Sequence, residues 1–104
     1  MYTEKDFHAI KDIIINKIPE TTGVILFGSY AKGTAREESD MDFAILTKRT
    51  LERPEKLKAL TELRWEIARR GYNADFLIKN EADFLWEKDL PTLSKVIFHE
   101  GVEL

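Results

Sequence analysis

The chain has 104 residues, of which 43% are hydrophobic and 34% charged, with a formal net charge of −3 and no cysteine. This length suits one domain with a single core, and the composition is typical of a folded globular protein. The negative charge argues against a broad surface of clustered Lys and Arg, so we expect no direct binding of nucleic acid. Any metal site must use oxygen or imidazole ligands.

The hydrophobic residues occur in short runs. None approaches the roughly 18 residues that indicate a membrane span, and the first residues, MYTEK, have no signal-peptide core. We therefore expect one cytoplasmic domain over residues 1–104 that does not enter a membrane.

The first predicted element is a helix that starts at Thr3 and stops at Pro19. Thr3 followed by Asp6 is typical of a helix start. Apolar residues recur at helical spacing at Phe7, Ile10, Ile14 and Ile18. A turn over residues 20–23 follows, and the first helix is expected to pack on a sheet.

Two apolar runs, residues 24–27 and 43–46, predict buried strands on either side of a polar loop. The loop, residues 28–42, reads GSYAKGTAREESDMD, with a short helix expected near residues 30–33. Gly28 lets the backbone approach a ligand closely, and Ser29 offers a hydroxyl and free N–H groups at a helix start. This end of the loop is a candidate phosphate seat.

The other end of the loop carries two acidic residues, Asp40 and Asp42, at the mouth of the second strand. Strand alternation sends both carboxylates to one face, roughly 7 Å apart at their Cα atoms. Mg²⁺ is commonly bound by one or two carboxylates together with substrate phosphates. A phosphate seat joined to a carboxylate pair therefore predicts a site for a magnesium nucleoside triphosphate.

The second half of the chain predicts a long helix from Pro54 to Gly71, where glycine would supply the terminating left-handed residue. Its expected buried stripe is Leu57, Leu60, Ile67 and Ala68, and its other face is charged. A third strand, residues 73–78, follows a helical crossover and should lie parallel to the second. Asp75 and Leu77 then share a face.

The last elements are short. Asn80 is expected to cap a helix that runs to Trp86, and Pro91 to occupy the first position of a helix over residues 92–99 that ends at Gly101. Residues 102–104 are a candidate edge strand. Three aromatic residues are expected in the core or in helix packing, although an exposed cluster near the last two would be a partner surface: Trp65, Phe84 and Trp86.

The motif of Gly28-Ser29, Gly33 and Ser39-Asp40-x-Asp42 resembles the signature of the nucleotidyltransferase superfamily, which includes DNA polymerase β and the aminoglycoside nucleotidyltransferases. A single small domain is most similar to the minimal nucleotidyltransferases, the MntA-like antitoxins encoded beside a HEPN-domain toxin. The resemblance spans nearly the whole chain. It implies an α/β (α+β) fold of the polymerase β type, with a mixed sheet flanked by helices.

The resemblance also implies the roles of the acidic residues. Asp40 and Asp42 would bridge two Mg²⁺ ions that clamp the attacking and leaving oxygens. Asp75 would be the third carboxylate, on a neighbouring strand, that holds the ion activating the acceptor hydroxyl. The plain alternative for Asp75 is a residue that only caps or solvates its strand.

Six loop residues are candidates for holding the nucleotide. Ser29 would grip the triphosphate, while the two glycines keep the loop tight and Ser39 fixes the turn that presents Asp40. Two basic residues are candidates to neutralise phosphate charge on location alone. The full set is Gly28, Ser29, Lys32, Gly33, Arg36 and Ser39.

The expected function is the transfer of AMP from ATP to a hydroxyl, with Mg²⁺ as cofactor. By resemblance the acceptor is a tyrosine of a cognate HEPN toxin, which would form a hetero-oligomer with this chain. One alternative is an antitoxin that acts by stoichiometric binding without catalysis. Another is a nucleotidyltransferase that acts on a small molecule such as an aminoglycoside.

Overall fold

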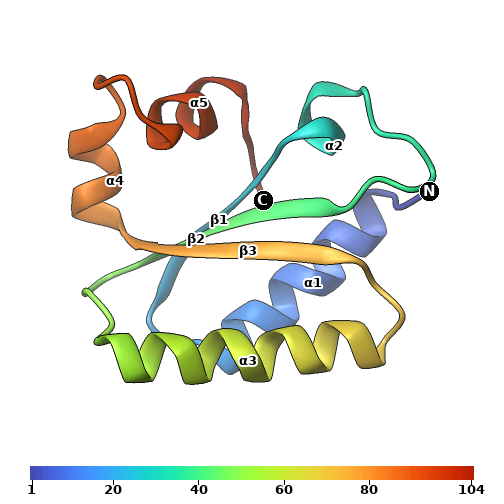
Figure 1. Ribbon diagram of the computed structural model, residues 1–104, viewed down its shortest axis with the longest axis horizontal. Coiled ribbons are helices and arrows are strands. Elements are labelled where there is room, and N and C mark those ends of the chain that lie inside the picture. The colour runs from blue at the N-terminus through green and yellow to red at the C-terminus, as the bar shows by residue number, and fades with distance from the viewer.

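The computed structural model describes residues 1–104 as a four-stranded sheet with helices on both faces (Figure 1). The elements in chain order are α1 (Glu4–Lys17), β1 (Thr21–Phe27), α2 (Ser29–Lys32), β2 (Met41–Thr47), α3 (Arg53–Arg69), β3 (Ala74–Asn80), α4 (Glu81–Glu87), α5 (Leu93–Glu100) and β4 (Val102–Glu103).

The strands lie in the order β3-β2-β1-β4. β1 pairs antiparallel with both β2 and β4, whereas β2 pairs parallel with β3 across the connection formed by α3. The predicted parallel pair, the mixed sheet and the short final edge strand are therefore confirmed. Because β3 is at the edge, its free side is open to contacts from α3.

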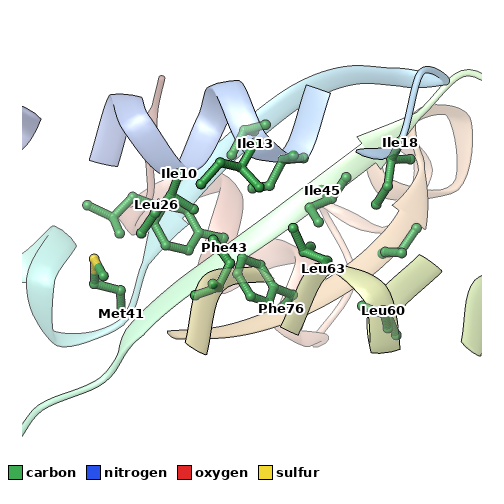
Figure 2. Close-up of a cluster of buried hydrophobic side chains, with 14 of the residues drawn as sticks. Ile10, Ile13, Ile18, Leu26, Met41, Phe43, Ile45, Leu60, Leu63 and Phe76 are labelled. Carbon is green, nitrogen blue, oxygen red and sulfur yellow. The ribbon is translucent and has the colours of Figure 1, made fainter. Parts of the chain in front are cut away.

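Helices α1 and α3 cover one face of the sheet, and α2, α4 and α5 lie on the other (Figure 1). The α1/α3 face carries the main core, in which side chains of both helices meet the same face of β1, β2 and β3 (Figure 2). The buried members are Ile10, Ile13, Ile14, Ile18, Val24, Leu26, Met41, Phe43, Ile45, Leu51, Leu60, Leu63, Ile67, Phe76 and Ile78. Alternate residues of β2 and β3 thus point away from the site described below.

The α4/α5 face has a much smaller core of Ala44, Leu46, Phe84 and Ile97. This cluster lies toward the carboxyl-terminal half of β2. The amino-terminal ends of β2 and β3 on the same face carry acidic residues instead.

Several local signals act as expected. Thr3 and Asp6 form a capping box at the start of α1, and the Asn80 side chain accepts a hydrogen bond from the Asp83 N–H (2.7 Å) at the start of α4. Gly71 follows α3 with a φ of 85°, a left-handed conformation that suits glycine.

The predicted stripe of α3 is partly wrong. Leu57 is 55% exposed and Ala68 is also exposed, whereas Leu63 is fully buried beside Leu60 and Ile67. At 100° per residue, Leu57 and Ala68 lie about 90° around the helix from the centre of the buried stripe. A periodic apolar pattern can therefore be shifted by one helical position.

Three other expectations need correction. Pro91 precedes the N-cap of α5, because the Thr92 hydroxyl caps the helix by accepting from the Lys95 N–H (3.3 Å). β1 begins at Thr21, within the expected turn, and its pairing with β2 is irregular near Gly23.

The tryptophans are the third correction. Trp65 is 71% exposed and Trp86 is 74% exposed, and only Phe84 of the three aromatic residues is buried. None of the helices is both long enough and apolar enough to cross a membrane.

Candidate active site

The turn between β1 and α2 packs directly against Asp42. Phe27, the last residue of β1, pairs with Asp42 across the sheet, and Gly28 then turns with a φ of 73°. A Cβ atom at Gly28 would lie 2.3 Å from the Asp42 Oδ2 atom. Glycine is therefore needed for its conformation and for its size, and the backbone before Ser29 touches the acidic side chain.

Ser29 begins the short helix α2 and ties the loop through its backbone. Its carbonyl accepts hydrogen bonds from the N–H groups of Gly33 and Thr34, the latter at 3.0 Å. Gly33 ends the helix with a φ of 75°. These contacts use only the Ser29 backbone carbonyl, and they fix the turn that presents Ser29.

Ser39 fixes the other end of the loop as predicted. Its hydroxyl accepts a hydrogen bond from the Arg36 N–H (2.9 Å), and its own N–H donates to the Arg36 carbonyl (3.0 Å). The closed turn leads into Asp40, an exposed residue one position before β2.

Asp42 and Asp75 are paired neighbours on the parallel strands β2 and β3. Both lie on the face opposite the main core, since Phe43 and Phe76, the next residue on each strand, belong to that core. They line one pocket of about 240 Å³, whose walls are Phe27, Asp42, Asp75, Phe76, Leu77 and Leu93. The pocket combines two carboxylates with an apolar wall that includes the first residue of α5.

The electrostatic surroundings of Asp42 are unfavourable for its charge. Burial raises the pKa of Asp42 above its ordinary value, and the negative charges of Asp75 and Asp40 raise this pKa further. A carboxylate in this state gains from a proton or from a cation. The charges of Asp40 and Asp75 thus both act on the Asp42 carboxylate.

Asp75 is turned partly toward the edge of the sheet. Its Oδ1 atom accepts a hydrogen bond from the Phe76 N–H (2.9 Å) and an ion-paired bond from Arg64 Nη2 of α3 (3.3 Å). No group of three or more His, Asp or Glu side chains converges to hold a metal ion. The structure therefore brings Asp42 and Asp75 to one pocket and places Asp40 near them, without gathering all three around one point.

Neither of the two basic loop residues contacts Asp40, Asp42 or Asp75. Lys32 pairs with Glu100 of α5 (3.6 Å), and Arg36 is exposed with its hydrogen bonds made by the backbone. A role for either in holding phosphate stays a prediction based on position in the loop.

Two residues of the site, Leu93 and Arg64, were not identified from the sequence. Leu93 lines the pocket because the turn before α5 brings the start of this helix near β3. No sequence motif around Leu93 indicates this position. Arg64 lies on the charged face of α3, which was expected only to be solvated. Its position on a helix beside an edge strand becomes informative only once the strand order is known.

The donor set is compatible with Mg²⁺. Carboxylate oxygens are the hard ligands that this ion prefers, and the repulsion at Asp42 is what a bound cation would relieve. Gly28 allows the backbone to approach the same carboxylate, where a phosphate could bridge to the ion.

Known proteins resemble this chain over most of its length. The family model for the nucleotidyltransferase domain matches residues 8–104. The chain is 34% identical over 90 residues to the protein adenylyltransferase MntA of Shewanella oneidensis, a match that covers 86% of this chain and 55% of that protein. It thus spans about half the length of this curated relative.

Solved structures share the fold at lower identity. A toxin–antitoxin complex with AMP-PNP contains a chain with a TM-score of 0.64 and 22% identity, over 92% of this chain and 69% of that one. A chain in the structure of the tri-AMPylated Shewanella oneidensis HEPN toxin in complex with MNT antitoxin has a TM-score of 0.60 and 18% identity. This match covers 96% of the present chain and 69% of that one. A proposed nucleotidyltransferase of Sulfolobus solfataricus has a TM-score of 0.64 and 21% identity. This match covers 95% of the present chain and 76% of that one. These similarities establish the fold.

Proposed function

The chain belongs to the nucleotidyltransferase domain family, and we propose that it transfers AMP from ATP to a hydroxyl group of a protein. The observation that carries this proposal is the contact of Gly28 with Asp42, the strand neighbour of Asp75. It joins a turn suited to phosphate with a pair of carboxylates suited to a cation.

In the proposed reaction the acceptor oxygen attacks the α-phosphorus of ATP. A new phosphorus–oxygen bond forms, the bond to the β-phosphate breaks, and pyrophosphate leaves while the acceptor hydroxyl loses its proton. Ser29 would hold the triphosphate through its hydroxyl and N–H. Asp40, Asp42 and Asp75 would hold two Mg²⁺ ions, which supply charge neutralisation at the attacking and leaving oxygens.

We propose a tyrosine of a HEPN toxin as the acceptor. The curated relative is a protein adenylyltransferase, and one structural neighbour is a complex with an AMPylated HEPN toxin. A protein partner also accounts for the large apolar side chains exposed on and between α4 and α5: Leu85, Trp86, Leu90, Leu93, Val96 and Phe98. Because ATP is the substrate, we place the reaction in the cytoplasm.

A stoichiometric antitoxin without catalysis is the second candidate. The exposed apolar side chains on α4 and α5 suit this function equally well, and the acidic residues are not gathered around one point. A small-molecule acceptor such as an aminoglycoside would instead need an enclosed second pocket beside Asp75.

The test is to incubate the purified chain with Mg²⁺, labelled ATP and the HEPN protein encoded beside it, and then to weigh the partner. We expect a mass gain of one or more AMP groups that is abolished by Asp42→Asn. Asp12→Asn is the matched control, because Asp12 is an exposed acidic residue of α1 on the opposite face. It should leave the mass gain unchanged.

Each other outcome identifies a different function. Neutralisation of the partner without a mass gain, equally by wild type and Asp42→Asn, would establish the stoichiometric binder. Label that appears on an added aminoglycoside and never on protein would establish the small-molecule enzyme.

A further inference from the structure

Arg64 contributes the one guanidinium that contacts an acidic residue of the candidate site. Its Nη2 atom lies 3.3 Å from Asp75 Oδ1, and the two side chains are 51% and 70% exposed. Arg64 belongs to α3, which packs on the face of the sheet opposite the pocket (Figure 1). The contact is possible because β3 is the edge strand, so that the arginine reaches the Asp75 carboxylate around the free side of the sheet.

The charges around this contact give it a physical role. Asp40, Asp42 and Asp75 place three negative charges at the start of β2 and β3, and repulsion between them has to be offset when no cation is present. Neither Lys32 nor Arg36 is directed to these carboxylates. Arg64 is therefore the counter-charge of Asp75 in the cation-free protein.

The same contact engages one oxygen of Asp75 that a bound cation would otherwise use. Oδ1 is held by Arg64 and by the Phe76 N–H, and the three acidic residues do not converge. We propose that Arg64 is a positioning residue that holds Asp75 in the cation-free protein and is exchanged for the divalent cation when it binds. This inference rests on the proposed function, because it assigns Asp75 to that cation.

The exchange has a limited and predictable size. An exposed ion pair at this distance is weak, so its loss should strengthen cation binding by about twofold to fivefold. Removal of a positive charge near the site also weakens the long-range repulsion of the cation, by an amount that does not depend on Asp75. Only an effect that passes through Asp75 disappears when Asp75 is itself neutralised.

The test is a titration with Mn²⁺, followed by the electron paramagnetic resonance signal of the free ion, on wild type, Arg64→Ala, Asp75→Asn and the double variant. We expect Arg64→Ala to bind Mn²⁺ about twofold to fivefold more tightly than wild type, and most of this gain to be lost when Asp75→Asn is also present. Arg70→Ala is the control, because Arg70 lies on the same helix, is 52% exposed and pairs with Glu66 instead. It should change Mn²⁺ affinity much less than Arg64→Ala does.

Equal or weaker Mn²⁺ binding by Arg64→Ala would overturn the exchange, and so would a gain of affinity that persists undiminished in the Asp75→Asn background. Arg64→Lys, which retains the charge, should restore most of the wild-type affinity. A wild-type protein that binds no Mn²⁺ and transfers no AMP would instead overturn the proposed function itself. The two failures are therefore distinguishable.

Discussion

The two faces of the sheet differ in what they contribute. The face covered by α1 and α3 buries a 15-residue apolar cluster, whereas the face under α4 and α5 buries four apolar residues and leaves Asp42 and Asp75 beside a pocket. The same strands supply both faces, because alternate residues of β2 and β3 point in opposite directions. The larger core can hold the strands in register while the other face carries negative charges that repel one another.

The comparison predicts that changes on the two faces affect different measurements. Substitutions at the acidic residues should reduce activity without loss of stability, and substitutions in the main core should reduce stability. The following predictions test this division in order of decreasing effect.

The largest effect is expected for Asp42→Asn. Loss of the carboxylate on which both acidic neighbours act should lower AMP transfer by about 10³-fold or more. The free energy of unfolding at neutral pH should stay equal or rise, because a half-buried and repelled charge is removed. Labelled-ATP assays and urea denaturation measure the two quantities, and a destabilised variant would contradict the division.

The next effect is expected in the core of the opposite face. Leu63→Ala removes a fully buried side chain of α3 and should lower the free energy of unfolding by roughly 2–5 kcal/mol. Leu57→Ala on the same helix is the control, because Leu57 is 55% exposed and should lose little stability. Similar losses for the two variants would show that the buried face of α3 has been assigned wrongly.

The turn at Gly28 should link the two measurements. Alanine there costs about 1–3 kcal/mol of backbone strain, because a φ of 73° with a ψ of −154° is a conformation almost confined to glycine. It also places a Cβ atom 2.3 Å from Asp42 Oδ2, so the carboxylate must move. We expect AMP transfer to fall by about 10- to 100-fold. Gly71→Ala also places alanine at a positive φ, 85°, but with no neighbour within 4 Å. It should cost stability without this loss of activity.

The smallest effect concerns pH. The pKa of Asp42 is raised in the folded protein above its ordinary value of 3.8, so the folded state binds this proton more tightly than the unfolded chain does. The stability contributed by Asp42 is therefore greatest at low pH and falls as the pH rises through the raised pKa. Asp42→Asn should gain stability relative to wild type over that interval. Denaturation would be measured at a series of pH values from roughly 3.5 to 7, which lie on either side of this titration. The difference in free energy of unfolding between Asp42→Asn and wild type should grow as the pH rises. A difference that shrinks would contradict the prediction.

Much of the fold followed from the sequence because its local signals are strong. The capping box at Thr3, the cap at Asn80 and the left-handed glycine at Gly71 all act where they were expected. The exposed Trp65 and Trp86 were missed because their size and aromatic character favoured burial, although helical spacing puts Trp65 on the side of α3 opposite Leu60 and Ile67. Burial depends on packing between elements, which local patterns do not encode.

The site was partly predictable for the same reason. The Gly28-Ser29 turn and Asp42 are linked by short-range spacing and lie together, and the strand pairing places Asp75 beside Asp42. Arg64 could not be foreseen, because its contact depends on β3 lying at the sheet edge next to α3. The catalytic roles of these residues stay predictions.

The most direct test of the central claim is a crystal structure of the protein with Mg²⁺ and a non-hydrolysable ATP analogue. The account predicts a cation coordinated by Asp42 and by phosphate oxygens, with the triphosphate against Ser29. A nucleotide bound elsewhere, or a cation that does not touch Asp42, would contradict it.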